Sequence, residues 1–173
     1  MKELISKKAS ISLVESQDIV MDSCDLFKFG GHKANLLRLD LNGCNLQESG
    51  WCNSKIDESN FSSVNADKSS FFSSEIKDSN FYRAKLSKSG FSSSFVYQCD
   101  FTAANLSQAE FSKSRCIFVS FLGANLFHCN FYNAKFVEVN IKDALVDHYL
   151  EKMIDKNLAN EDQRPPLLYE GVE

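Results

Sequence analysis

Large apolar residues recur every five positions along most of this chain. From Leu26 to Ile141 every fifth residue is large and apolar, except Gly31, Ala66 and Cys116. The residue two places before each of these central residues is nearly always Ala, Ser, Cys or Val. A period of five fits neither a helix, with its period of 3.6, nor a strand, with its period of two. It predicts a coil that turns a corner once per five residues and points one small and one large residue inward.

A second alternation predicts that the coil has four sides. The central residue is Phe at every tenth position from 61 to 131, and it is smaller at the positions between them. A coil of four five-residue units places Phe on two opposite sides, whereas a three-sided coil would mix large and small residues in every column. Stacked coils would then pair backbone to backbone at a spacing of about 4.8 Å.

Several of these units resemble those of a known repeat family. AANLS (103–107), GANLF (123–127) and DSNFY (78–82) are similar to the A(D/N)LXX units of the pentapeptide repeat proteins. The resemblance implies an all-β solenoid, a right-handed quadrilateral parallel β-helix of about six 20-residue coils over residues 24–143. Several members of that family resemble duplex DNA in shape and charge, bind DNA gyrase or topoisomerase IV, and protect the enzyme from quinolones or toxins. A topoisomerase modulator, a DNA mimic linked to antibiotic resistance, is therefore one expectation for this chain.

The two ends depart from the period. Residues 1–23 keep it only weakly and are expected to form a degenerate capping coil, because an open end of stacked strands promotes aggregation. Residues 144–173 are expected to hold a helix over about 144–158, with Asp143 as its N-cap, and an extended tail. The helix is expected to cap the last coil, to pair with a second copy, or to do both, and the resemblance favours a homodimer. Its apolar residues follow helical spacing: Val146, Tyr149, Leu150, Met153 and Ile154.

Residues that could carry catalysis are few. His32 and Cys52 lie 20 residues apart and would stack on the outer surface, as a Cys nucleophile with a His base or half of a metal site. No third ligand or orienting carboxylate joins them, so we interpret them as a chance surface pair. Cys24 and Cys44 would stack in the inward column and are expected to be reduced. We therefore expect no catalytic residue, no metal and no cofactor.

Charge limits the partners that this chain could bind. The net charge of −4 gives no basic field, which argues against direct binding of nucleic acid. Residues 24–143 hold 13 basic and 12 acidic residues, and the net charges of the four sides are +1, +1, 0 and −1, so no side forms the acidic ribbon that a DNA mimic would need. Asp147, Glu151 and Asp155 form an acidic stripe, interpreted as a solvated helix face or an acidic docking surface. Six Cys, with neither a signal-like run nor a membrane span, favour the cytoplasm.

One side of the predicted coil breaks the rule that outward residues are polar. Its outward apolar residues fall on consecutive coils and would form a contiguous surface of several hundred Å², a size that calls for a partner. This patch is either a partner or dimer surface, or it is covered by the tail from Pro165 to Val172. We expect a non-enzymatic protein-binding module, either a topoisomerase modulator or a scaffold or bacterial effector that displays the patch to another protein. The patch consists of Phe95, Tyr97, Ile117, Phe118 and Val137.

Overall fold

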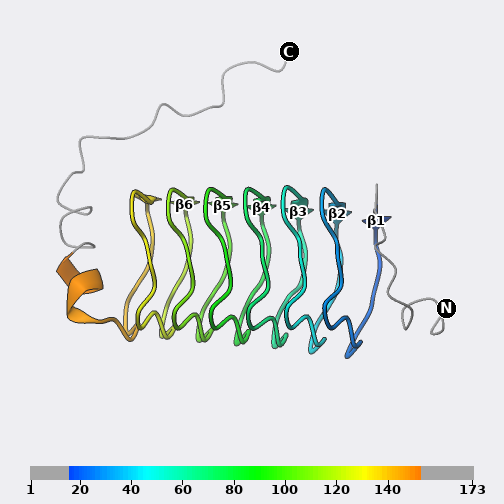
Figure 1. Cartoon of the computed structure of the whole chain (residues 1–173), viewed down its shortest axis with the longest axis horizontal. Helices are drawn as coiled ribbons and strands as arrows, with labels where there is room; N and C mark the ends of the chain where they lie inside the picture. Colours follow the sequence, from blue (N-terminus) through cyan, green and yellow to red (C-terminus); the bar gives the residue numbers. More distant parts are fainter. Residues whose placement is uncertain (1–15, 153–173) are drawn as a thin grey trace, which may run out of the picture.

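The chain forms a rod of stacked coils with one parallel sheet along one side (Figure 1). The computed structural model describes residues 16–152. Its seven strands follow one another in the sheet in sequence order, so each coil lies next to the coil that precedes it in the chain. The strands are β1 (Ser16–Gln17), β2 (Asn35–Leu37), β3 (Lys55–Asp57), β4 (Glu75–Lys77), β5 (Phe95–Tyr97), β6 (Arg115–Ile117) and β7 (Lys135–Val137).

The register confirms the 20-residue coil. Leu36 lies beside Ile56, and Ile56 lies beside Ile76, in parallel pairs that are each 20 residues apart. The other three sides of the coil are joined by single parallel bridges with the same spacing, such as Asn45 to Asn65. Four backbone contacts per coil make the rod four-sided, and the expected parallel all-β solenoid is therefore confirmed.

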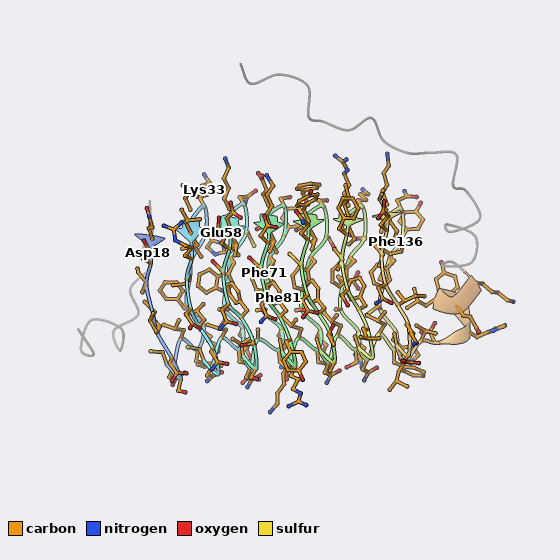
Figure 2. All side chains as sticks on the ribbon, turned by 180° about the vertical axis from the view of Figure 1, so that it is seen from behind. Asp18, Lys33, Glu58, Phe71, Phe81 and Phe136 are labelled. Carbon is orange, nitrogen blue, oxygen red and sulfur yellow. The ribbon has the colours of Figure 1, made fainter. Side chains whose placement is uncertain are left out.

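The Phe residues fill two opposite columns of the core, as the alternation predicts. Phe71 and Phe91 are stacked with ring centroids 4.8 Å apart, and Phe81 and Phe101 are stacked at 4.7 Å. Rings of the two columns meet edge to face, as between Phe81 and Phe91 at 6.3 Å and 85°. Figure 2 shows Phe71 and Phe81 in the interior of the rod. Both arrangements are favourable for aromatic rings, so the two columns interlock from Phe61 to Phe131.

The corners are made by one left-handed residue in each five-residue unit. The second residue after every central one has a positive φ, from Asp18 at 55° to Asp143 at 59°. Only Gly43 and Gly123 are glycines at these positions, although glycine is the residue that adopts this conformation without steric cost. Ala103, with a φ of 57°, occupies the position that Gly123 occupies one coil later.

The exception at Gly31 has a steric cause. A Cβ at Gly31 would lie 2.6 Å from Cε3 of Trp51, the central residue of the next coil on that side. Trp51 is 1% exposed and donates a hydrogen bond from Nε1 to Oγ of Ser49 at 2.7 Å. The large indole therefore occupies the space that a side chain at residue 31 would need.

The regular coil begins before residue 24. Residues 16–23, expected to belong to a degenerate cap, pair in the same register, with Ser16 beside Leu36 and Val20 beside Asp40. Arg38 ties this first coil to the second through Nε, 2.6 Å from Oδ1 of Asp18. Backbone pairing does not require an apolar central residue, so the coil continues through the weak part of the repeat. Residues 1–15 of the expected cap lie outside the described residues.

The C-terminal helix begins later than expected. Residues 148–152 are helical, the bridge from Asn125 to Leu145 extends the coil, and the expected start at residue 144 is wrong. The N-cap is Asp147 rather than Asp143, because Oδ1 of Asp147 accepts a hydrogen bond from the N–H of Leu150 at 2.9 Å. Within the described residues, no helix is both long and apolar enough to cross a membrane.

Candidate functional site: an aromatic patch on the strand side

The outward apolar residues come together on the last three strands. Strands β5, β6 and β7 are neighbours in the sheet, and Phe95, Arg115 and Lys135 lie in one row. Tyr97, Ile117 and Val137 form a second row, because the middle residue of each strand points into the core. Phe118 follows Ile117 at the next corner and is 40% exposed. We call the set Phe95, Tyr97, Ile117, Phe118 and Val137 the aromatic patch.

The rings of the patch contact one another. Phe95 and Tyr97 lie with centroids 6.0 Å apart at an interplanar angle of 18°, and Tyr97 meets Phe118 edge to face at 5.7 Å. The patch is thus one connected surface of three rings, two of them half-buried and one exposed. Such a surface remains in water at a cost, since burying apolar area contributes about 25 cal/mol per Å². Its geometry can bind an apolar side chain, and it offers no group for acid or base chemistry.

Two cations flank the Phe95 ring. The guanidinium of Arg115 lies 5.4 Å from the ring centroid, and the ammonium of Lys77 lies 5.7 Å from it. Lys77 also forms an ion pair with Glu75 on its own strand. These cation–π contacts hold both charges against the patch. The Lys77 charge is compensated by Glu75, and the Arg115 charge has no such carboxylate.

A basic edge borders the patch on the Arg115 side. Lys135 is the register partner of Arg115 on the next coil and is exposed. Lys113 is exposed at the corner that precedes β6, where its φ is 59°. Across residues 16–152, no ion pair joins any of these three side chains to a carboxylate. We call Lys113, Arg115 and Lys135 the basic edge.

The predicted outward pair of His32 and Cys52 does not come together as a reactive pair. The His32 ring lies over Gly50, where an added Cβ would be 2.6 Å from its Cε1. The thiol of Cys52 lies 3.2 Å from the hydroxyl of Ser70. Gly50, on the next coil, has no side chain and so leaves room for the imidazole of His32. The described residues hold no group of three or more His, Cys, Asp or Glu arranged as a metal site.

The described cysteines are free thiols, as expected for Cys24 and Cys44. Burial raises the pKa of Cys116 to about 12, and it has the same effect on Cys99. Burial likewise raises the pKa of Cys44 to about 11. A thiol with such a pKa carries almost no thiolate at neutral pH and is a poor nucleophile. These side chains are packing residues of the core.

The helix residues divide between core and surface. Leu150 is 1% exposed and Val146 packs against the core, whereas Tyr149 is 66% exposed. Asp147 accepts hydrogen bonds from the N–H of Leu150 and, through Oδ2, from the N–H of His128 at 3.0 Å. These bonds, first that from Leu150, lower the pKa of Asp147. Asp147 therefore caps the helix and anchors it to the last coil.

The remaining helix positions are only partly described. Glu151 is exposed, and its carboxylate lies 3.6 Å from Nδ1 of His148. Met153, Ile154 and Asp155 lie outside the described residues. The dimer contact and the acidic stripe expected on this helix therefore stay predictions.

Sequence reasoning found the apolar residues of the patch and missed its basic edge. The 20-residue spacing that brought Phe95 together with Ile117 also aligns Phe95, Arg115 and Lys135. Charges summed over a whole side of the coil concealed this local cluster, because the side also carries Glu58 and Asp78 on earlier coils and Glu138 on the same coil as Lys135. Grouping charges by register row would have placed Arg115 beside Lys135.

Comparison with known proteins defines the class of the repeat. The family model described as pentapeptide repeats matches eight copies, at residues 79–115 and 99–143. Residues 79–143 therefore belong to the pentapeptide repeat family, and residues 16–78 form coils in the same register. The resemblance seen in the sequence is confirmed. Pentapeptide repeat proteins are in general non-enzymatic structural or interaction modules.

Several solved structures are similar to this chain. One is a pentapeptide repeat protein from the thylakoid lumen of Arabidopsis thaliana, with 14% identity, 67% of this chain and 77% of that chain covered, and a TM-score of 0.49. HetL, which is involved in heterocyst differentiation regulation in the cyanobacterium Nostoc, has 13% identity, coverage of 83% and 91%, and a TM-score of 0.44. QnrB1, a plasmid-mediated fluoroquinolone resistance protein, has 13% identity, coverage of 84% and 88%, and a TM-score of 0.37.

With TM-scores below 0.5, these likenesses say nothing about what this chain binds. The comparison with curated proteins found no match.

Proposed function

We propose that this chain is a non-enzymatic module that binds another protein through the aromatic patch. The observation that carries the proposal is the contact of three rings, Phe95, Tyr97 and Phe118, on the outer face of a rod whose other aromatic columns are buried. The core of the rod does not need these rings, because the inward positions of the same coils are filled by Val96 and Cys116. Aromatic side chains with Arg beside them are typical of the centres of protein interfaces.

The test uses a matched pair of substitutions. Phe118 and Gln108 occupy the same position in their five-residue units, on opposite sides of one coil, and both have a positive φ. Phe118→Ser should abolish binding of a purified partner, identified by cross-linking at residue 118, and Gln108→Ser should leave it unchanged. Ser is well suited to the position, since Ser93 occupies it on a neighbouring side with a φ of 59°. Equal binding by both variants would reject the patch as the site.

A topoisomerase is the named version of this proposal. The family to which residues 79–143 belong and the unbroken rod from residue 16 to residue 145 support DNA gyrase or topoisomerase IV as the partner. The balanced charge of the rod argues for contact through the aromatic patch rather than by imitation of DNA. A gyrase supercoiling assay with and without quinolone tests this partner. If micromolar protein has no effect, the topoisomerase is rejected and the scaffold or effector role remains.

Two further parts of the proposal concern assembly and location. A homodimer through the C-terminal end is supported by the exposed Leu145 and Tyr149, which are 63% and 66% exposed. Light scattering at several concentrations tests it, with a mass of two chains as the expected result. The six free cysteines support a reducing compartment such as the cytoplasm.

A further inference from the structure

The aromatic patch and the basic edge together define what an occupant must offer. An apolar side chain can cover Phe118 and Tyr97, whose rings are 5.7 Å apart. Carboxylates can pair with Arg115 and Lys135, which are register partners on adjacent coils, about 4.8 Å apart. The occupant is therefore an acidic segment with aliphatic or aromatic residues close to its carboxylates. The three cations of the basic edge have no competing ion pair in the described part of the chain.

The two cations of this row are available to such a segment. The guanidinium of Arg115 lies over the Phe95 ring with its Cζ 5.4 Å from the ring centroid, and two of its N–H donors can still be accepted by one carboxylate. Lys135 is exposed at the end of the row, because β7 is the last strand of the sheet among the described residues. A carboxylate placed between them would relieve the repulsion of two like charges on neighbouring strands.

The chain itself contains a segment of this chemistry. Residues 161–170 read EDQRPPLLYE, with two adjacent carboxylates at Glu161 and Asp162 and a third at Glu170. The apolar residues Leu167, Leu168 and Tyr169 stand directly before Glu170. We infer that residues 161–170 occupy the aromatic patch of their own chain, with the leucines and the tyrosine on the rings and the carboxylates on the basic edge. This inference rests on the proposed binding role of the patch and adds its regulation.

The length of the chain permits this contact. Leu167 lies fifteen positions after Lys152, the last described residue, and an extended chain of that length spans about 50 Å. The patch lies on the last three strands of the rod, about 10 Å along the stack. In Figure 1 the helix lies at the lower edge of the rod end and the strands at the upper edge. Most of the span of about 50 Å is therefore available for the segment to cross the end of the rod.

The consequence is that a partner has to compete with residues 161–170. A segment tethered by a short linker acts at an effective concentration of about 1 mM. If the free segment binds with a dissociation constant of about 50 μM, the tether weakens the apparent affinity of any competitor about twentyfold. The partner of the patch should therefore present carboxylates beside apolar residues, as residues 161–170 do, and bind more tightly.

The experiment uses the full chain in two forms. The first is the native chain, and the second, the tail-substituted chain, carries Leu167→Ser, Leu168→Ser and Tyr169→Ser. Fluorescence anisotropy measures the binding of a labelled peptide of residues 160–173 to each. We expect the peptide to bind the tail-substituted chain at least tenfold more tightly than the native chain, where the tethered segment competes. Binding should weaken at least threefold between 0.05 and 0.5 M salt, because it depends on exposed ion pairs.

Substitutions in the tail-substituted chain locate the site. Phe118→Ser and Lys135→Glu should each weaken peptide binding at least tenfold. Their matched controls, Gln108→Ser and Lys85→Glu, lie at the same positions of the unit on the opposite side of the rod and should change it less than twofold. Glu is compatible with the fold at this position, because Glu75 occupies it on β4. Circular dichroism then verifies the fold of each variant.

Three results would overturn the inference: no peptide binding to the tail-substituted chain, equal binding to both chains, or equal sensitivity to the control substitutions. The proposed function fails by a different result, namely the absence of a protein adduct from residue 118 of the tail-substituted chain. A peptide that does not bind, together with such an adduct, would remove the tail from the patch and leave the binding role in place.

Discussion

Two buried serines in one coil should respond in opposite ways to the loss of their hydroxyls. The hydroxyl of Ser74 donates to the carbonyl of Trp51 at 2.7 Å and accepts the N–H of Ser54 at 3.2 Å. Neither backbone group has another hydrogen-bond partner in the described residues. Ser69 is 1% exposed, and its Oγ has no partner. The Ser74 hydroxyl thus satisfies two backbone groups of the preceding coil. The Ser69 hydroxyl is buried without a hydrogen bond.

The magnitudes follow from the cost of unpaired polar groups. Ser74→Ala leaves an N–H and a C=O unpaired, and each such group costs about 1–3 kcal/mol, part of which is recovered when the two approach each other across the turn. We expect Ser74→Ala to lower the free energy of unfolding by about 2 kcal/mol. Ser69→Ala should leave it unchanged or raise it by about 1 kcal/mol. Urea unfolding followed by circular dichroism measures both values. Equal losses in the two variants would refute the hydroxyl-pairing argument.

Four further outcomes can be measured on single variants or by labelling. Phe91→Ala removes a ring that is stacked on both sides, with centroids 4.8 and 4.7 Å away. It should lower the free energy of unfolding in urea by about 3–5 kcal/mol, and a loss under about 1 kcal/mol would contradict the ring column. Ala103→Gly, at a φ of 57°, should raise stability by about 1 kcal/mol, and a loss would contradict the left-handed corner. At pH 8, iodoacetamide should label Cys52 and spare Cys116, whose pKa is about 12, until the protein is denatured, and labelling at equal rates would disprove that burial. Asp147→Ala should cost about 1 kcal/mol at pH 7. Because the folded pKa of Asp147 is lowered, that difference is present above the ordinary carboxyl pKa and should vanish as the pH falls through the lowered value, and a difference that persists in acid would contradict the charged cap.

The fold could be predicted from the sequence because the solenoid repeats one local rule. Each central residue from Leu26 to Phe131 is buried between neighbouring coils, so the residue pattern of one five-residue unit predicts the burial of the next. The apolar pattern missed strand β1, which is held by backbone pairing without an apolar central side chain. Ser16 lacks an apolar side chain and yet pairs with Leu36, because parallel bridges use only backbone groups.

The end of the rod was harder to predict for a related reason. Val146 continues the central column of the coil after Leu126, and its spacing to Leu150 also fits one face of a helix. Both patterns share the same residues, so periodicity alone could not place the boundary. The hydrogen bonds of Asp147 place it, since a side chain that caps a helix ends the coil before it.

The residues of the aromatic patch were predicted from the sequence, but the cation–π contacts around it were not. Spacing alone places Phe95, Tyr97 and Ile117 on neighbouring coils, and the structure keeps them there. The stacking of Arg115 on Phe95 depends on side-chain conformation, which no period encodes. The same holds for His32, whose ring lies over Gly50.

Site-specific photo-cross-linking tests the binding role of the patch most directly. A benzoylphenylalanine placed at residue 118 of the tail-substituted chain should form an adduct with one protein of the source cell on irradiation. The same probe at residue 108, on the opposite side of the coil, should form none. The captured protein, once purified, should bind the chain at least tenfold more weakly after Phe118→Ser. Equal adducts from residues 118 and 108, or none from residue 118, would contradict the account.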